Sequence, residues 1–309
     1  MKSIIRIKHA YILWIGCLLT AATHAQQDPG YTQYMYNTMV VNPGYAGSAG
    51  VLEGTLLHRS QWTGIDGAPQ TQSLTIDSPL SNEKIGIGLS VVNDKLGPSN
   101  ELSLDANVSY TISFSHDTKL VFGAKAGIRS MSVDWSKGRY YDDVDALLNN
   151  NISKTKPSVG AGLYLYQDKW YAGISVPSFL RSEYYDDIQE AVLSDRLHYY
   201  AIAGYVFDIG DNLKLKPAVL GKFVSGAPVT VDLSLNALIM EKLTAGVSHR
   251  FDDSVSALVG FQITPGLFAG YSFDYTTTRL NKYADGTHEI ILRFQMQKKA
   301  SQIKSPRFF

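Results

Sequence analysis

Strict alternation of apolar and polar residues, repeated along most of the chain, constrains the fold of this protein more than any other feature. Residues 102–112 alternate without a break, and residues 85–91 and 229–237 show the same period of two. This period is typical of a β-strand with one apolar and one polar face. About fourteen segments of this kind occur, near 51–61, 70–77, 84–93, 102–114, 118–130, 157–167, 169–176, 197–209, 212–223, 228–239, 241–251, 253–263, 266–275 and 286–296.

The length of these segments separates two kinds of β-protein. Most are about ten residues long, which suits a tilted strand that crosses a bilayer, whereas strands of globular proteins average about five or six. Helical periodicity is nearly absent, and no further segment holds 18 consecutive apolar residues. We therefore expect an all-β protein, a transmembrane antiparallel β-barrel of about fourteen strands over residues 51–296, in contact with outer-membrane lipid. A soluble β-sandwich also alternates, but it does not need strands of this length throughout.

The connections between the predicted strands fall into two length classes. Short turns such as 115–117 and 264–266 follow one set of strands, and longer connections follow the other. Outer-membrane barrels have short periplasmic turns and long outer loops, and an even strand count predicts that both termini, including a C-terminal tail at 297–309, are periplasmic. The expected long loops are 62–69, 94–101, 131–156, 177–196 and 276–285.

Charged residues of the predicted strands lie on the polar face. Because a charge that faces lipid costs roughly 2–4 kcal/mol at the midplane, we expect these side chains in the lumen. Asp232 and Arg250 lie on neighbouring strands, as do Asp105 and Lys125, so cross-strand pairs are expected. The predicted lumen network is Arg59, Asp105, Lys125, Asp232, Arg250, Asp274 and Arg293, and Asp77, Arg129 and Glu289 share its face. A girdle of interfacial aromatic side chains is expected from Trp62, Trp170, Tyr171, Tyr199, Tyr200 and Phe251.

The first 25 residues have the pattern of a signal peptide. Basic residues precede an apolar run at 10–22, and Ala25 provides a cleavage site. Cys17, the one cysteine of the chain, is removed with this segment, so no disulfide framework is expected. A lipoprotein is the alternative interpretation, although Trp14 and the apolar residues after Cys17 fit a lipobox poorly. Equal numbers of basic and acidic residues, 28 each, give no indication of nucleic-acid binding.

Residues 26–50 follow the predicted cleavage site and precede the first predicted strand. This segment is rich in Tyr, Asn and Met and poor in charge, which is not typical of a solvated, disordered tail. We expect it to pack in or beneath the barrel mouth, either as a plug or as a periplasmic docking surface. The expected partner or plug contacts are Tyr31, Tyr34, Tyr36, Asn42, Pro43 and Tyr45.

Catalytic chemistry is not expected from this sequence. Ser248 and His249 are adjacent, and neighbours on a strand point to opposite faces, so they cannot form a nucleophile–base pair. The His residues are scattered and no metal-ligand spacing occurs, so neither a metal nor a cofactor is expected. Tyr-Tyr-Asp-Asp occurs at 140–143 and again at 184–187, in two predicted outer loops. The repeat is compatible with a partner surface or a weak cation site, but ordinary solvated loops, with Tyr at the interface and Asp in water, are the favoured interpretation.

Several phrases of the sequence resemble the PorP/SprF family, outer-membrane proteins of the type IX secretion system in Bacteroidetes. Two small departures are Gly44, where Ala is expected, and Ser60, where Asn is expected. The phrases cover the mature length: QYMYN…NPGYAGS (33–48), HRSQWTGIDGAPQTQSLTIDSPL (58–80), YAGISVPSFL (171–180), LHYYAIAGYVF (197–207), GYSFDY (270–275), GTHEIILRF (286–294) and SPRFF (305–309).

The resemblance implies a role in protein secretion. It implies export or surface attachment of a secreted protein with a C-terminal sorting domain, in some species a gliding adhesin. It also implies association with periplasmic, peptidoglycan-linked components and other parts of the secretion machinery. The alternative function is a passive outer-membrane porin for small solutes, because simple diffusion pores also have charged linings.

Overall fold

The computed structural model describes residues 29–81, 83–115, 117–138, 151–180, 197–224 and 227–296. Three predicted features lie outside these residues: the signal peptide at 1–25, the C-terminal tail at 297–309 and both Tyr-Tyr-Asp-Asp sequences.

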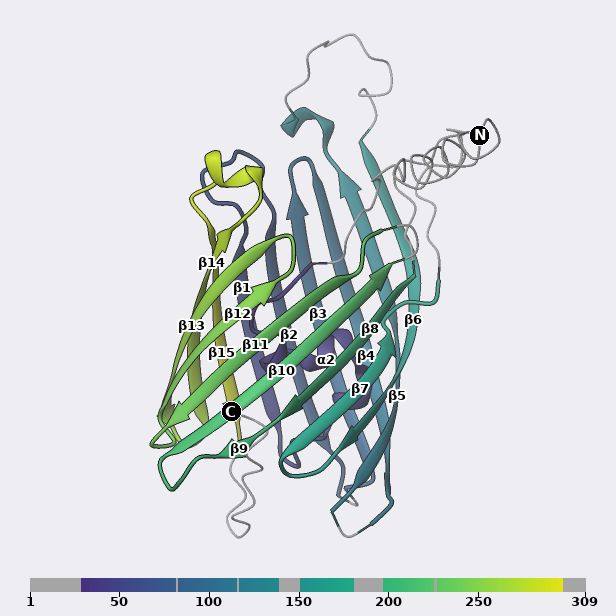
Figure 1. The fold of residues 1–309 in the computed structure, drawn as a ribbon. Helices are drawn as coiled ribbons and strands as arrows, with labels where there is room; N and C mark the ends of the chain where they lie inside the picture. Colours follow the sequence, from purple (N-terminus) through teal and green to yellow (C-terminus); the bar gives the residue numbers. More distant parts are fainter. Residues whose placement is uncertain are drawn as a thin grey trace, which may run out of the picture.

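A single antiparallel sheet closes on itself to form a barrel (Figure 1). Closure occurs because β1 pairs with β15 and β10 pairs with β11. β9 continues the line of β8 along β10, so the two form one barrel strand interrupted at Val206, and the described residues make the fourteen strands that the alternation predicted. The strands are β1 (Glu53–Ser60), β2 (Gln70–Pro79), β3 (Ile85–Leu96), β4 (Ser99–Ser113), β5 (Lys119–Val133), β6 (Ile152–Tyr166), β7 (Trp170–Val176), β8 (His198–Tyr205), β9 (Phe207–Asp208), β10 (Leu213–Val224), β11 (Thr230–Ile239), β12 (Leu243–Arg250), β13 (Ser254–Thr264), β14 (Leu267–Thr276) and β15 (Thr287–Gln295).

The two faces of the sheet differ in chemistry as the period of two requires. Leu56, Leu235 and Ile290 lie on the outer face and are about half exposed, at 50%, 46% and 52%. Inward positions of the same strands carry polar or charged side chains that are buried, such as Arg59 and Glu289. An apolar outer band around a polar interior is the arrangement that lipid imposes on a spanning barrel. In the described part of the chain, no helix has the length and apolar character needed to cross a bilayer.

The two ends of the barrel differ in the connections they carry. We call the end with the turns β2–β3, β4–β5, β6–β7, β9–β10, β11–β12 and β13–β14 the short-turn mouth, and the other end the long-loop mouth. The prediction of a long loop at 94–101 is wrong. β3 and β4 extend toward each other until only Gly97 and Pro98 separate them. The expected loop at 131–156 is likewise shorter, because β5 runs to Val133 and β6 begins at Ile152. These strands continue beyond the segments in which apolar residues mark the lipid face.

The aromatic girdle is only partly as expected. Tyr199 and Phe251 lie on the outer face and are 47% and 49% exposed, whereas Tyr171 and Tyr200 are buried in the lumen. Tyr199 and Tyr200 are consecutive residues of β8, and consecutive residues of a strand face opposite sides of the sheet. The expectation was therefore wrong for Tyr171 and Tyr200, which face the lumen.

Residues 31–48, which we call the plug, lie inside the barrel. They form three short helical turns, η1 (Tyr34–Tyr36), α2 (Thr38–Val41) and η2 (Pro43–Tyr45), and nearly all of their residues are buried. α2 is visible through the wall of strands in Figure 1. Aromatic and aliphatic plug residues share one buried cluster with side chains from the wall. That cluster includes Tyr34, Tyr36, Met39, Tyr45, Val121, Tyr164, Leu258 and Phe268.

The plug crosses the lumen from one mouth to the other. Its leading end lies at the long-loop mouth, where the carbonyl of Tyr31 accepts a hydrogen bond from Arg250, the last residue of β12. Beyond its trailing end, the backbone of Leu52 pairs with Met296 at the short-turn mouth. The described chain thus begins and ends at opposite mouths. An even strand count fixes only the two ends of the barrel, and the termini themselves lie outside the described residues, so the expectation that both are periplasmic stays a prediction.

Candidate functional site

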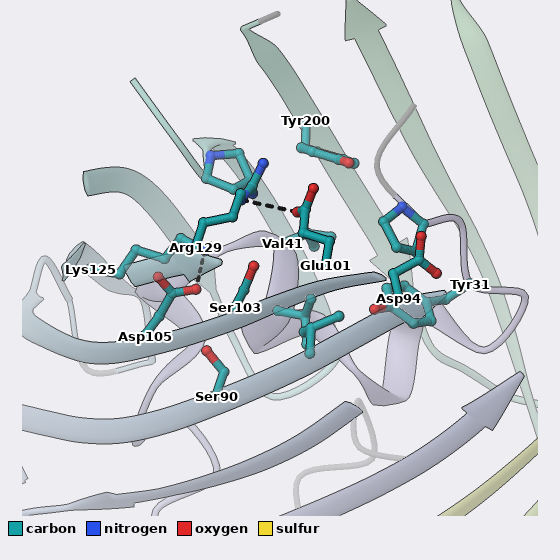
Figure 2. A pocket seen from close by; sticks show the side chains of 14 residues that line it. Tyr31, Val41, Ser90, Asp94, Glu101, Ser103, Asp105, Lys125, Arg129 and Tyr200 are labelled. Carbon is teal, nitrogen blue, oxygen red and sulfur yellow. Dashed lines mark hydrogen bonds and ion pairs between the residues drawn. The ribbon is translucent and has the colours of Figure 1, made fainter. Parts of the chain in front are cut away.

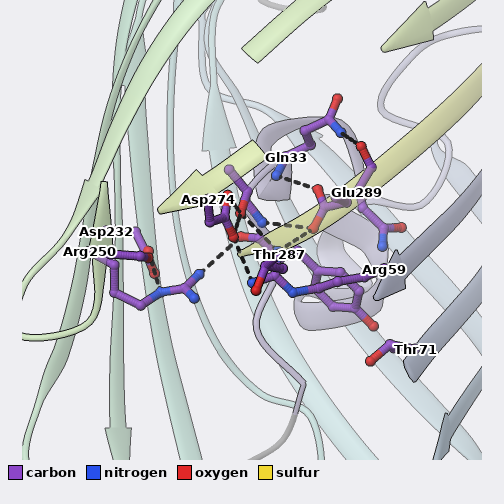
Figure 3. A network of polar contacts seen from close by, with 12 residues as sticks. Gln33, Arg59, Thr71, Asp232, Arg250, Asp274, Thr287 and Glu289 are labelled. Atoms are coloured by element: carbon purple, nitrogen blue, oxygen red, sulfur yellow. Dashed lines mark hydrogen bonds and ion pairs between the residues drawn. The ribbon is translucent and has the colours of Figure 1, made fainter. Parts of the chain in front are cut away.

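A clamp of charged wall residues holds the leading end of the plug. Arg59 of β1 donates to Asp274 of β14 at 2.8 Å and to Glu289 of β15 at 3.0 Å, with all three side chains nearly inaccessible to solvent. The same guanidinium donates to the hydroxyl of Thr32 at 2.9 Å, and that hydroxyl donates to Asp274 at 2.8 Å. Figure 3 shows Arg59 between the two carboxylates. Thr32 therefore completes an ion-pair network built by three neighbouring strands.

The clamp also binds the plug backbone. The two carboxylate oxygens of Glu289 accept from the backbone N–H groups of Thr32 and Gln33, at 3.0 and 2.8 Å. Hydrogen bonds to an ionised acceptor are among the stronger ones in proteins. Because Glu289 is completely buried, the loss of these donors would leave a charge poorly compensated inside the lumen. The wall and the plug thus satisfy each other's polar groups.

A second ion pair lies beside the clamp. The structure brings Asp232 and Arg250 together directly across β11 and β12, with Arg250 Nε donating to Asp232 at 2.6 Å. Arg250 also donates to Asp253 at 3.2 Å and to the carbonyl of Tyr31 at 3.4 Å. The predicted pair therefore contacts the plug as well as the wall.

A pocket lies above the plug against the wall formed by β3, β4 and β5, with about 560 Å³ of space, part of which is open solvent. Its wall carries two ion pairs, Lys125–Asp105 at 2.9 Å and Arg129–Glu101 at 3.2 Å (Figure 2). The plug forms part of the lining. Its contribution is Tyr31, Val40 and Val41, and Pro29, Asp94, Pro177 and Tyr200 are among the other lining residues.

Near the short-turn mouth, the ring of Tyr36 lies close to two cationic side chains. Lys216 Nζ is 5.1 Å and Arg293 Cζ is 5.0 Å from the ring centroid, and the ring packs against Phe268 at 5.0 Å. Cations over an aromatic face are attracted by its quadrupole. Tyr34 bonds to Ser234 at 3.0 Å one turn earlier. Arg293, predicted as part of a charge network, thus contacts an aromatic plug residue, and no ion pair to it is found within the described ranges.

The trailing half of the plug is fixed by Asn42 and its neighbours. Asn42 accepts from the backbone of Gly44 at 2.9 Å and donates to the carbonyl of Leu163 at 3.0 Å, while Pro43 begins η2. An Asn side chain ahead of Pro is a common helix-start arrangement. Tyr45 donates to Glu53 at 3.0 Å, and the backbone of Gly47 donates to Asp77 at 2.6 Å. This part of the plug is therefore held at the short-turn mouth.

Glycines in the wall allow the plug to lie against the strands. A Cβ at Gly123 of β5 would overlap the backbone of Pro43 and Gly44, and a Cβ at Gly86 of β3 would overlap the carbonyl of Ala46. Glycine within a strand often marks a close approach by another part of the backbone. The inner surface of β3 and β5 is therefore shaped to the plug.

The structure places all thirteen predicted site residues at the lumen: six belong to the plug and seven to its wall. It does not unite the seven charges into one network, because Asp105 and Lys125 pair with each other on β4 and β5, several strands away from Arg59 on β1 and Asp274 on β14. The sequence reasoning missed Thr32 and Gln33, which carry the clamp contacts. It also missed the buried charges Glu53, Lys216 and Lys222, of which the two lysines share the inward-facing spacing of β10.

The chemistry of the lumen is that of a packed interior. Among the described residues, no three His, Cys, Asp or Glu side chains are grouped so as to hold a metal ion. Ser248 donates to the carbonyl of Leu233, and the ring of His249 packs against Phe251. The polar groups around the plug bind and orient a peptide segment.

Solved structures similar to this chain are membrane barrels. Omp33 of Acinetobacter baumannii is 11% identical, with 80% of this chain and 99% of that chain covered and a TM-score of 0.43. A FadL homologue of Pseudomonas aeruginosa is 14% identical, with 88% and 95% covered and a TM-score of 0.44. The CymD monoaromatic hydrocarbon channel is 10% identical, with 86% and 92% covered and a TM-score of 0.48. At these scores, the three barrels say nothing about the role of this chain.

The sequence itself matches one family over most of its length. No curated protein matches this chain. A family model described as type IX secretion system membrane protein PorP/SprF matches residues 23–294, which include the plug and nearly the whole barrel. This is a family of secretion-system membrane proteins and not a family of enzymes. The chain is therefore an integral outer-membrane protein that belongs to the PorP/SprF family of the type IX secretion system.

Proposed function

We propose that this protein is a plugged outer-membrane anchor of the type IX secretion system. It holds a cognate secreted protein with a C-terminal sorting domain at the cell surface, and its own lumen does not conduct that protein. The observation that carries the proposal is the plug, whose buried residues occupy the lumen from the long-loop mouth to the short-turn mouth.

The contacts of the plug support a closed lumen. Thr32 bonds to the wall at the long-loop mouth, and Asn42 and Gly47 bond to wall residues nearer the short-turn mouth. Passage of a polypeptide through the lumen would require these bonds to break and would leave Glu289 and Asp274 without their plug donors. The loss of partners from buried charges costs several kcal/mol. A stable plug therefore favours a holding role over a conducting one.

The two mouths provide surfaces for two kinds of partner. Long loops of outer-membrane barrels face the exterior and short turns face the periplasm. In this orientation the long-loop mouth contacts the secreted protein. The short-turn mouth, where Glu53 and Gln295 pair, contacts peptidoglycan-associated and other secretion components.

Conductance in planar bilayers tests the closed lumen. The purified barrel, with folding verified by heat-modifiable migration, is expected to give no steady current above that of protein-free membranes. A large, steady open-channel current would reject the anchor proposal and favour the passive porin.

Recovery of partners tests the secretion role separately. A tagged copy, isolated in mild detergent from its own cells, is expected to bring with it one secreted protein with a C-terminal sorting domain and one periplasmic anchor protein. An unrelated tagged outer-membrane barrel from the same cells serves as the control. Recovery of neither partner above this control would count against the proposal.

A further inference from the structure

The direction in which the plug crosses the lumen decides on which side of the membrane its leading end lies. Two sets of contacts establish this direction, one at each mouth. We propose that the leading end of the plug lies on the outer side of the membrane, at the cell surface. There Pro29 and the pocket above the plug are accessible to a protein outside the cell and not to a periplasmic protein.

The leading end is fixed at the long-loop mouth by residues at strand ends. Arg250 ends β12 and donates to the carbonyl of Tyr31 at 3.4 Å. Pro29 lines the pocket together with Glu101, which is near the start of β4, and with Pro177, which follows β7 directly. Both of these strand ends belong to the long-loop mouth. Pro29 and Tyr31 therefore lie at this mouth.

The trailing end is fixed at the opposite mouth. Gly47 donates to Asp77, two residues before the end of β2 at the short-turn mouth. Tyr45 donates to Glu53, the first residue of β1, and the carbonyl of Leu52 accepts from Met296 at 2.8 Å. Because β1 begins at the short-turn mouth, the chain must have crossed the lumen once before its first strand.

The outward mouth follows from the loops. The turns at the short-turn mouth are only a few residues long, whereas connections such as the one between β7 and β8 are much longer. In outer-membrane barrels the long connections are on the outer side. The leading end of the plug therefore shares its side with the long loops. This assignment goes beyond the anchor role, because it depends on the direction of the plug and not on any secreted partner.

Cysteine labelling on intact cells tests the assignment. Cys17 is the one native cysteine and lies in the predicted signal peptide, so single-cysteine variants need no further changes. Pro29→Cys is the test position. Tyr283→Cys, 73% exposed in the β14–β15 connection, marks the long-loop mouth, and Asp117→Cys, exposed in the β4–β5 turn, marks the short-turn mouth. The probe is a maleimide coupled to polyethylene glycol, which does not cross the outer membrane.

The proposal expects Pro29→Cys and Tyr283→Cys to be labelled on intact cells, and Asp117→Cys only after permeabilisation. Heat-modifiable migration verifies that each variant is folded. Labelling of Pro29→Cys only together with Asp117→Cys would overturn the direction of the plug. Labelling of Asp117→Cys alone on intact cells would overturn the orientation of the barrel. Neither result depends on recovery of a secreted partner, so failure here is distinguishable from failure of the anchor proposal.

Discussion

Arg59 is the residue through which the barrel and the plug depend on each other. Among the described residues it is the one cation that donates to Thr32, Asp274 and Glu289 together, and its own side chain is almost fully buried. A buried ion pair contributes little net stability when compared with apolar packing, but removal of one partner is strongly destabilising. Arg59 is therefore a position at which substitution should strongly affect stability.

Substitution of Arg59 by leucine tests this dependence. Arg59→Leu leaves two buried carboxylates without their shared cation, and we expect a loss of about 3–5 kcal/mol in the free energy of unfolding. Urea unfolding in lipid vesicles, followed by tryptophan fluorescence, measures the loss. Arg279→Leu, on the 3₁₀ turn η5 (Arg279–Lys282), is the matched control and is expected to change stability by no more than about 0.5 kcal/mol. Equal unfolding midpoints for the two variants would contradict the role of the clamp.

At the scale of elements, the plug and the strands that face it form one packed unit. Gly123 of β5 and Gly86 of β3 let the plug backbone approach the wall, and Ser109 and Ser175 donate to plug carbonyls at 2.7 Å each. These contacts come from strands that the sequence separates widely from the plug. The fit is therefore a property of the assembled barrel.

A larger side chain at Gly123 should displace the plug. Gly123→Val adds atoms where the backbone of Pro43 and Gly44 now lies. We expect faster cleavage within residues 31–48 by an added protease, and channel openings in planar bilayers that the unmodified protein lacks. Gly54→Val is the matched control, because the nearest atom to a Cβ there is 3.8 Å away on the outer side of β1. If both variants resist protease as the unmodified protein does, the plug is not held by this close approach.

The alternation allowed the strands to be predicted, whereas the path of the plug could not be. Each strand lies between lipid and lumen, so its consecutive residues alternate between apolar and polar, as in 102–112. The plug is surrounded on all sides and has no period. Its direction depends on contacts such as Thr32 with Asp274, which join residues at opposite ends of the sequence. For the same reason, the charges Asp232 and Arg250 could be paired from adjacent strands, but their contact with Tyr31 could not be foreseen.

The whole molecule is an inverted arrangement in which polar residues lie inside and apolar residues face lipid. Leu235 lies at the middle of β11 and is 46% exposed on the outer face, opposite Val247, which is 58% exposed. Its neighbour Asn236 is almost fully buried inside. The position of a charge relative to this wall therefore decides its effect.

A cation on the outer face should destabilise the barrel according to its depth. For Leu235→Arg we expect a loss of about 2–4 kcal/mol, the cost of an arginine at the bilayer midplane. Met240→Arg, 66% exposed at the short-turn mouth, is the matched control and should cost about 0–1 kcal/mol. Urea unfolding in vesicles measures both. A larger loss for Met240→Arg than for Leu235→Arg would contradict the lipid-facing assignment of β11.

The plug is attached at both of its ends, so its length must match the distance between the two points of attachment. At one end it is covalently continuous with β1, and at the other the clamp grips Thr32 and Gln33. The distance between these points is set by the height of the barrel, and thus by the thickness of the membrane. An inserted or deleted residue between 33 and 47 would break either the contacts of Thr32 and Gln33 with the clamp or the close packing of the plug against Gly123 and Gly86. Variation in length therefore belongs in the outer loops, and the plug must keep its residue count for as long as the barrel keeps its height.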